Sequence, residues 1–265
     1  MIKEGYCLLF DAAGKKVEFY KSSKPAYFIS SLLAGLYVGI CMVTILVMGG
    51  MFDNFAGIKI LQGASFAAAL SLVVFAGSEL FTGNVFVMTA GVAGKKVSVR
   101  DAAGLCAFCY FGNLAGSLLV AALFLGTGYL QGHVLTAATA SIIAKTSPGA
   151  SELLIRGILC NLLVCAGVWC YYRLKSESGK LILIFWCIYL FVVCGFEHCI
   201  ANMTLFGLGT FANLGGVSSL VPMAANLAST TLGNILGGMA LSVAYYAIAK
   251  TGAPFGAGRD KPDEQ

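Results

Sequence analysis

Residues 77–84 read GSELFTGN, and residues 195–202 read GFEHCIAN. Both stretches place a glycine, then a glutamate, then an asparagine inside long apolar runs. A glutamate at membrane depth costs several kcal/mol unless it is paired or hydrated, and a neighbouring glycine lets a helix break. We therefore expect each stretch to interrupt a membrane helix. The residues expected to hold these two interruptions are Glu79, Asn84, Glu197 and Asn202.

A second pair of matching segments makes this pattern an internal repeat. Residues 112–116 read GNLAG and residues 233–237 read GNILG, at nearly the same separation as the first pair. The chain therefore contains two copies of a unit of three spans. Because three is odd, the second copy is inverted in the membrane, and inverted repeats with interrupted helices indicate a binding or permeation site near the midplane.

The composition is typical of a polytopic membrane protein. Hydrophobic residues make up 58% of the 265 residues and charged residues 11%, and the mean hydropathy is +0.86, whereas soluble domains carry about 25% charged residues. The net charge of +5 comes from basic residues scattered among short loops, which excludes a nucleic-acid interface. The 10 cysteines lie almost all within apolar runs, so we interpret them as small buried hydrophobes.

Each crossing of a bilayer needs about 20 apolar residues. The apolar runs predict an all-α protein with spans at residues 26–50, 60–94, 102–132, 153–172, 181–211 and 217–249. We therefore assign residues 26–250 to one membrane domain. Residues 1–25 form an N-terminal segment before it, and residues 251–265 form a C-terminal tail.

The basic residues predict the orientation. Most of the 17 Lys and Arg residues lie on the side shared by both termini, and Lys59, Lys145 and Arg156 fall on the other side. The positive-inside rule then places both termini in the cytoplasm. Residues 1–25 lack an apolar leader and alternate apolar with basic residues. They are either an interfacial amphipathic helix or a plain solvated tail.

His198 stands out as the histidine within a predicted span. It lies beside Glu197 at one interruption, and Leu80 holds the equivalent place in the other copy of the repeat. An imidazole at membrane depth next to a helix break indicates a functional role, as a donor of a hydrogen bond or of a proton.

Three motifs together resemble the formate/nitrite transporter family of bacterial membrane anion channels, over nearly the whole chain. They are ELFTGN at residues 79–84, GILCNLLVC at 157–165 and FEHCIANM at 196–203. In detail the chain is similar to the hydrosulfide channel branch from anaerobic sulfite reducers. The resemblance implies an aquaporin-like protomer with broken second and fifth helices. It also implies a homopentamer in the bacterial inner membrane, with one pore in each protomer.

The resemblance also implies roles for single residues. Thr82 matches the family's pore threonine, His198 its central histidine, Lys145 its vestibule lysine and Asn161 its fourth-span asparagine. The matching pore-narrowing residues are Phe66, Leu70, Leu80 and Phe191. Apolar constrictions of this kind exclude hydrated ions. One position departs from the pattern, because many formate channels carry aspartate where this chain has Glu79, a change that keeps the charge but alters the loop and the pore width.

These observations predict a channel for small monovalent anions of weak acids, with hydrosulfide first and formate and nitrite next. The alternative within the family is a dedicated formate or nitrite channel or proton symporter. A neutral-solute channel of the aquaporin class would carry Asn-Pro-Ala at the breaks, but none of the 5 prolines follows an asparagine.

A membrane enzyme could use Glu79, Glu197 and His198 as metal ligands, but no second histidine lies in a predicted span. We therefore expect no enzyme activity, no metal and no cofactor. The expected partners are small monovalent anions, the lipid bilayer and further copies of the chain.

Overall fold

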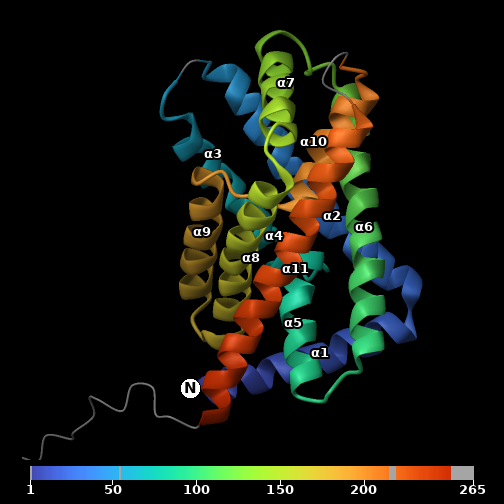
Figure 1. The fold of residues 1–265 in the computed structure, drawn as a ribbon, viewed down its shortest axis with the longest axis vertical. Coiled ribbons are helices and arrows are strands. Elements are labelled where there is room, and N and C mark those ends of the chain that lie inside the picture. The colour runs from blue at the N-terminus through green and yellow to red at the C-terminus, as the bar shows by residue number, and fades with distance from the viewer. Residues whose placement is uncertain (1, 54, 215–218, 252–265) are drawn as a thin grey trace, which may run out of the picture.

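The computed structural model describes residues 2–53, 55–214 and 219–251, and these residues form an all-helical bundle (Figure 1). The helices are α1 (Ile2–Ser22), α2 (Lys24–Met51), α3 (Ile58–Phe66), α4 (Ala68–Phe75), α5 (Phe81–Ala93), α6 (Val99–Gly126), α7 (Gly132–Thr146), α8 (Ala150–Arg173), α9 (Glu177–Val193), α10 (Cys199–Phe211) and α11 (Leu220–Thr251). The all-α prediction is confirmed for this part of the chain. Residues 217–218 of the last predicted span and residues 252–265 of the predicted tail lie outside the described residues.

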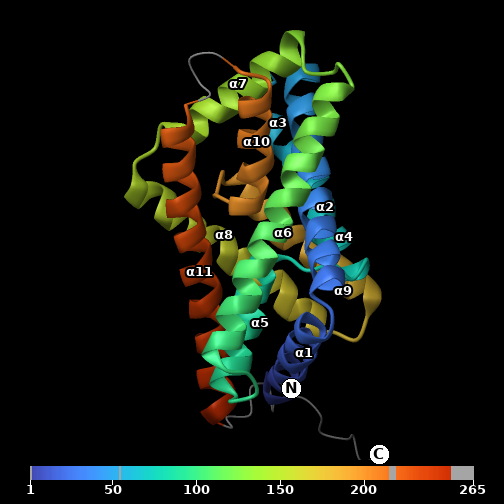
Figure 2. The same ribbon diagram turned by 90° about the vertical axis from the view of Figure 1, so that its right-hand side faces the viewer.

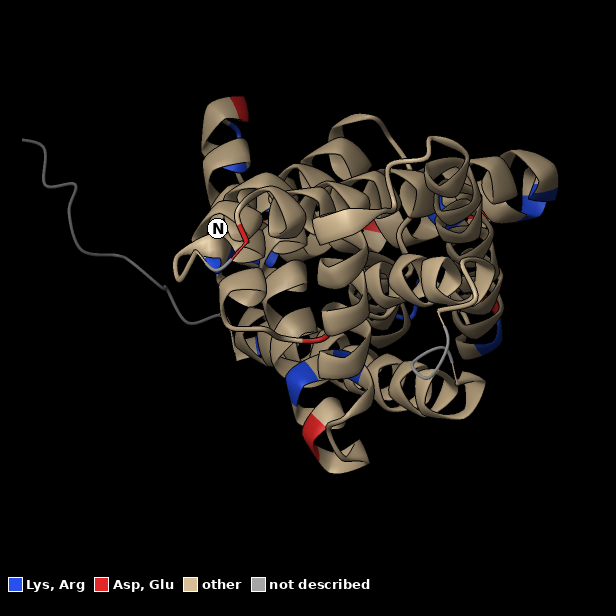
Figure 3. Cartoon of the chain, turned by 90° about the horizontal axis from the view of Figure 1, so that it is seen from above, with Lys and Arg blue, Asp and Glu red and all other residues tan. Residues whose placement is uncertain are grey.

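The lengths and apolar surfaces of the helices are those of a membrane protein. Within the described ranges, five stretches are long and apolar enough to cross a bilayer: Lys24–Met51, Ile58–Phe75, Val99–Gly126, Ala150–Arg173 and Leu220–Thr251. Helices α5 and α10 are apolar but shorter. Large apolar side chains such as Ile29, Phe111 and Leu123 lie exposed on the outside of the bundle, and a view from above shows few charged positions along the ribbon (Figure 3).

The helix α4 gives way to α5, and α9 to α10, at the two Gly-x-Glu motifs. The first residue of each motif has a positive φ, +72° at Gly77 and +70° at Gly195. Glycine adopts this left-handed conformation without the steric cost that a side chain brings. The sequence repeat therefore coincides with two places where the backbone leaves the helical conformation.

The helices α1 and α7 lie at opposite ends of the bundle (Figures 1 and 2). The helix α1 lies across the lower end in Figure 1. Its buried face consists of Tyr6, Leu9, Ala13 and Val17, and the hydroxyl of Tyr6 donates to the carbonyl oxygen of Ser242 in α11 (2.8 Å). The N-terminal segment is thus a helix with its apolar face packed on the bundle.

The second repeated motif lies where two pairs of helices approach closely. A Cβ on Gly116 of α6 would overlap the carbonyl oxygen of Leu32 in α2, and a Cβ on Gly237 of α11 would overlap that of Ile158 in α8. Small residues allow membrane helices to pack at this distance. The pairs α2–α6 and α8–α11 therefore depend on the same Gly-Asn-x-x-Gly pattern.

Candidate permeation pathway

The first interruption is held by hydrogen bonds to its free backbone groups. The N–H of Glu79 donates to the carbonyl oxygen of Ser30 (3.2 Å). Asn113 donates from Nδ2 to the carbonyl oxygen of Glu79 (2.9 Å) and accepts at Oδ1 from the N–H of Phe81 (2.9 Å). Lipid offers no partners to such groups, so Asn113 of the GNLAG motif supplies them.

The second interruption is held in the same way. The N–H of Glu197 donates to the carbonyl oxygen of Arg156 (3.3 Å). Asn234 donates from Nδ2 to the carbonyl oxygen of Glu197 (2.9 Å) and accepts at Oδ1 from the N–H of Cys199 (3.0 Å). The two repeated motifs therefore contact each other in both halves of the chain. The asparagine of Gly-Asn-x-x-Gly hydrogen-bonds to the backbone of the glutamate in Gly-x-Glu.

A lysine and an asparagine bind each glutamate side chain. Lys16 on α1 lies 2.6 Å from Oε1 of Glu79, and Asn84 donates from Nδ2 to Oε2 (2.8 Å). Tyr27 also donates its hydroxyl to Oε2 (3.0 Å). Burial opposes the charge on Lys16, but the neighbouring carboxylate of Glu79 outweighs it, and the pKa of Lys16 is raised above its ordinary value. Lys16 is therefore positively charged at neutral pH.

The arrangement around Glu197 matches the arrangement around Glu79. Lys145 on α7 lies 3.1 Å from Oε1 and 3.0 Å from Oε2 of Glu197, and Asn202 donates from Nδ2 to Oε2 (2.6 Å). The Glu197 side chain is only 2% exposed, so the ion pair compensates a charge that would otherwise be costly to bury. The helices α1 and α7 thus play equivalent roles, each contributing one lysine.

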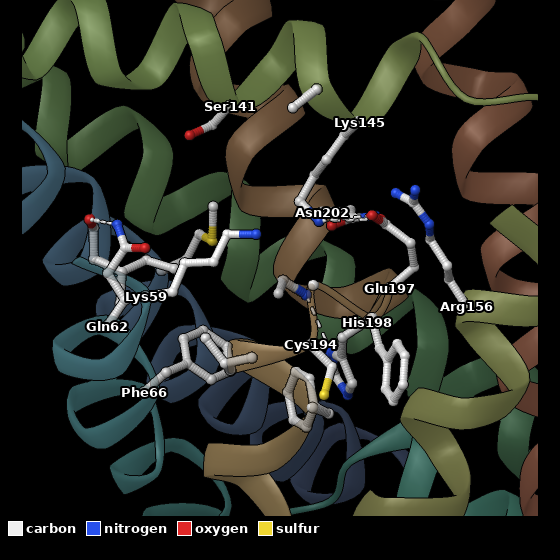
Figure 4. Close-up of a pocket in the computed structure, with 18 of the residues that line it drawn as sticks. Lys59, Gln62, Phe66, Ser141, Lys145, Arg156, Cys194, Glu197, His198 and Asn202 are labelled. Atoms are coloured by element: carbon white, nitrogen blue, oxygen red, sulfur yellow. Dashed lines mark hydrogen bonds and ion pairs between the residues drawn. The ribbon is translucent and has the colours of Figure 1, made fainter. Parts of the chain in front are cut away.

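Three cavities adjoin one another around these groups. The upper vestibule, on the side of α7, has a volume of about 360 Å³ and is bordered by Lys145 and Glu197 (Figure 4). The lower vestibule, on the side of α1, has a volume of about 180 Å³ and is bordered by Lys16 and Glu79. A central chamber of about 10 Å³ is lined mainly by apolar side chains.

Two apolar constrictions separate the vestibules from the central chamber. Phe66 and Phe191 border both the upper vestibule and the chamber, with their rings 5.9 Å apart in an edge-to-face arrangement. Leu70 and Leu80 border both the chamber and the lower vestibule. A cavity of this size holds about one water molecule, so an ion cannot carry its hydration shell through it.

Among the described residues that line the central chamber, His198 is the one with a polar side chain. Its Nδ1 accepts the N–H of Ala201 (3.3 Å), which caps the start of α10. Its Nε2 lies 3.1 Å from Oγ1 of Thr82. Because Nδ1 is an acceptor here, the neutral ring carries its hydrogen on Nε2 and donates it to Thr82. The hydroxyl hydrogen of Thr82 is then free to make another hydrogen bond.

A family model described as Formate/nitrite transporter matches residues 4–248. The chain belongs to the formate/nitrite transporter family. It is similar to the nitrite transporter NirC of Escherichia coli (strain K12), with 38% identity over 231 residues, 86% of this chain and 85% of the relative. Its relatives are transporters and channels, so the chain belongs to a transport family and not to an enzyme family.

Two solved structures share the fold of this family. One, described as an FNT family ion channel, has a TM-score of 0.87 and 32% identity, covering 92% of this chain and 98% of its own. The other, described as a pentameric formate channel with formate bound, has a TM-score of 0.78 and 29% identity, covering 87% of this chain and 99% of its own.

Within the described residues, no cluster of His, Cys, Asp and Glu side chains suits a metal ion.

The pore residues implied by the family resemblance fall into two groups. Those that border a cavity are Phe66, Leu70, Leu80, Lys145, Phe191 and His198. Thr82 and Asn161 are fully buried. Asn161 donates from Nδ2 to the carbonyl oxygens of Thr82 (3.3 Å) and Asn234 (2.6 Å). Asn161 therefore connects the two halves of the repeat, and like Thr82 it borders none of the three cavities.

Sequence reasoning missed several residues that the structure brings to the site. Lys16 lies in the predicted N-terminal segment outside the membrane domain, and in the sequence Asn113 and Asn234 indicate only the repeat. Asn113 and Asn234 occupy the same position in the two copies of Gly-Asn-x-x-Gly, and this repetition could have indicated that they contribute to the site. The sequence contains no such signal for Lys16. The number of residues between Lys16 and Lys145 differs from the number between Glu79 and Glu197, so the two lysines do not appear as part of the repeat.

Proposed function

We propose that the chain is a membrane channel for small monovalent anions of weak acids. The observation that carries this proposal is the mainly apolar central chamber, bordered by His198, between two vestibules that each contain a lysine–glutamate pair. A chamber of this kind opposes the passage of hydrated charge. The anion of a weak acid can shed its charge by taking up a proton, whereas chloride cannot do so under the same conditions.

The proposed topology has six crossings in two inverted repeats with an aquaporin-like arrangement. Helices α3, α4 and α5 together make the second crossing, and α9 and α10 make the fifth. The matching hydrogen bonds of Asn113 and Asn234 support this assignment. Both termini then lie on one side, which the distribution of basic residues makes the cytoplasmic side of a bacterial inner membrane.

Hydrosulfide is the substrate that we propose first. Its anion has one heavy atom, whereas formate and nitrite have three, and the central chamber has a volume of about 10 Å³. Hydrogen sulfide is also a weaker acid than formic or nitrous acid, so a larger share is neutral near pH 7. The second candidate is a dedicated formate or nitrite channel or proton symporter, which the relatives named for nitrite and formate favour.

The test is a comparison of fluxes in proteoliposomes. Hydrosulfide, nitrite and formate should all pass far faster than sulfate, because a narrow apolar path penalises a divalent, strongly hydrated ion most. Hydrosulfide should pass fastest of the three. Sulfate flux equal to formate flux would overturn the channel proposal, and nitrite or formate flux well above hydrosulfide flux would favour the second candidate.

We also propose that the protein is a homopentamer with one pathway in each protomer. The similarity to a structure described as a pentameric formate channel supports this assembly. The exposed apolar side chains on the outside of the bundle leave surface for both neighbouring protomers and lipid.

A further inference from the structure

The two vestibules differ in their balance of charge. In the lower vestibule, the positive charge of Lys16 is matched by the negative charge of Glu79 (2.6 Å). The upper vestibule has more cations than carboxylates. The charged residues that line it are Lys59, Lys145, Arg156 and Glu197. The upper vestibule therefore has an excess of positive charge, and the lower one has none.

Two of the three upper cations already have a carboxylate partner. Lys145 binds both oxygens of Glu197 (3.1 and 3.0 Å), and Arg156 pairs with Glu152 on its own helix. Lys59 makes no ion pair or hydrogen bond through its side chain with any residue that the structure describes. A paired cation attracts a further anion weakly, because its partner cancels most of its field. The uncompensated charge of the vestibule therefore belongs to Lys59.

Lys59 also lies close to the start of the constriction. In Figure 4 its side chain extends from α3 into the cavity, on the opposite side from Lys145. A Cβ on Gly195 would lie 3.8 Å from Nζ of Lys59, so the ammonium is beside the loop that leads to His198. Phe66 lies two turns further along the same helix, and residues at this spacing share a helix face.

We propose that Lys59 forms an anion-binding site in the upper vestibule, which captures a small monovalent anion before it reaches Phe66 and His198. This inference deepens the proposed function and rests on it. Lys59 is an exposed residue, so it binds the anion loosely, as conduction requires. Lys145 has a different role, because its ammonium compensates Glu197 at the second interruption.

The experiment measures formate current through planar bilayers that contain the full chain, with equal formate on both sides. The orientation is established by protease cleavage of a C-terminal tag from one chamber. At low salt, parent current should be larger when anions enter from the Lys59 side. Lys59→Gln should reduce that current about fivefold, the factor expected for one unit charge near contact distance in water, and should abolish the difference between the two voltage polarities.

The controls separate a local site from an effect of the net charge of the protein. Lys59→Arg should behave like the parent, and the effect of Lys59→Gln should disappear in 1 M salt, where the screening length falls to about 3 Å. Lys175→Gln removes the same charge from an exposed position in the loop after α8 and should leave the current from the Lys59 side unchanged. Size-exclusion elution equal to that of the parent establishes that each variant is assembled.

Each outcome supports or overturns one statement. A parent that passes no monovalent anion, either as current or as flux in proteoliposomes, overturns the proposed function, and the Lys59 site with it. A conducting parent whose low-salt current is unchanged by Lys59→Gln overturns the Lys59 site alone. An equal loss in Lys59→Gln and Lys175→Gln also overturns it, since the effect would then come from the net charge of the protein.

Discussion

At the scale of single residues, His198 borders the central chamber and contacts the buried Thr82. His198 uses one ring nitrogen to cap α10 and the other to bind Thr82. A protonated ring would direct an N–H from Nδ1 at the N–H of Ala201, so this arrangement requires the neutral ring. The geometry therefore favours a fixed hydrogen-bond donor over a group that exchanges protons.

His198→Asn should keep much of the anion flux. Asparagine is a good helix N-cap and retains an N–H donor for Thr82, so anion current should fall by about fivefold at most, the value of one ordinary hydrogen bond. Current and internal pH are measured together across pH 5 to 8, the range in which histidine titrates. Loss of proton-linked uptake with unchanged anion current would show instead that His198 transfers a proton.

Leu80→Val should widen the lower constriction. Leu80 borders both the central chamber and the lower vestibule, and valine is shorter by one methylene. Formate and nitrite flux should rise relative to hydrosulfide flux, because the larger anions meet more steric resistance. Leu123→Val is the matched control, because it makes the same change on the outside of the bundle and should leave the flux ratio unchanged. An unchanged flux ratio in Leu80→Val would mean that the path does not run past Leu80.

At the scale of the elements, α1 and α7 hold the two interruptions from opposite ends of the bundle. Each contributes a lysine to a buried glutamate, Lys16 to Glu79 and Lys145 to Glu197. Removal of one partner from a buried ion pair leaves an uncompensated charge. The N-terminal helix is therefore part of the folded channel and contributes to its stability.

Lys16→Gln should destabilise the protein by about 3–5 kcal/mol, the usual cost of breaking a buried ion pair. The double variant Lys16→Gln, Glu79→Gln should recover part of this loss, because no unpaired charge is left. Thermal unfolding in detergent, followed by size exclusion, measures both. Equal unfolding temperatures in the parent and in Lys16→Gln would show that the pair does not hold the break.

The pH dependence of this effect follows from the raised pKa of Lys16. A raised pKa in the folded state contributes stability that is complete below the ordinary value of 10.5 and is lost as the pH rises through the folded value. The difference in unfolding temperature between the parent and Lys16→Gln should therefore be constant from about pH 6 to pH 8.

Gly237→Leu should disrupt the pairing of α8 with α11. Any side chain at this position overlaps the carbonyl oxygen of Ile158, and forcing atoms into a packed interface costs about 1–3 kcal/mol or more. Gly126→Leu is the control, because a Cβ there meets no atom within 4 Å. A stable, monodisperse Gly237→Leu protein with parental flux would contradict the close packing of these helices.

At the scale of the whole molecule, the protomer contains a complete series of vestibule, chamber and vestibule. Assembly is therefore not needed to complete the pathway, and the proposed pentamer should carry one independent path in each protomer. Native mass spectrometry should give five chains. Pentamers mixed from parent and Phe66→Trp chains should lose flux in proportion to the blocked fraction, and a steeper loss would indicate a path shared between protomers.

The all-α membrane class and the family could be predicted from the sequence alone, and the same sequence predicts that the helices are interrupted at the two Gly-x-Glu motifs. These properties depend on local chemistry: apolar length, the cost of a glutamate in lipid, and the freedom of Gly77 and Gly195 to take a positive φ. The Gly-Asn-x-x-Gly motif also indicates the internal repeat, whereas its place at two close helix pairs comes from the structure.

The contacts between residues that are distant in sequence could be found only in the tertiary structure. Lys16 and Glu79 are distant in sequence, and no periodicity links α1 to the break that it stabilises. Lys145, the predicted vestibule lysine, is paired with Glu197, and Lys59 is left as the uncompensated charge of the upper vestibule. Asn161 is buried and hydrogen-bonded to the backbone of Thr82 and of Asn234, which are distant from it in sequence. Ion pairing and burial depend on the packing of all the helices together, and a linear pattern does not contain that information.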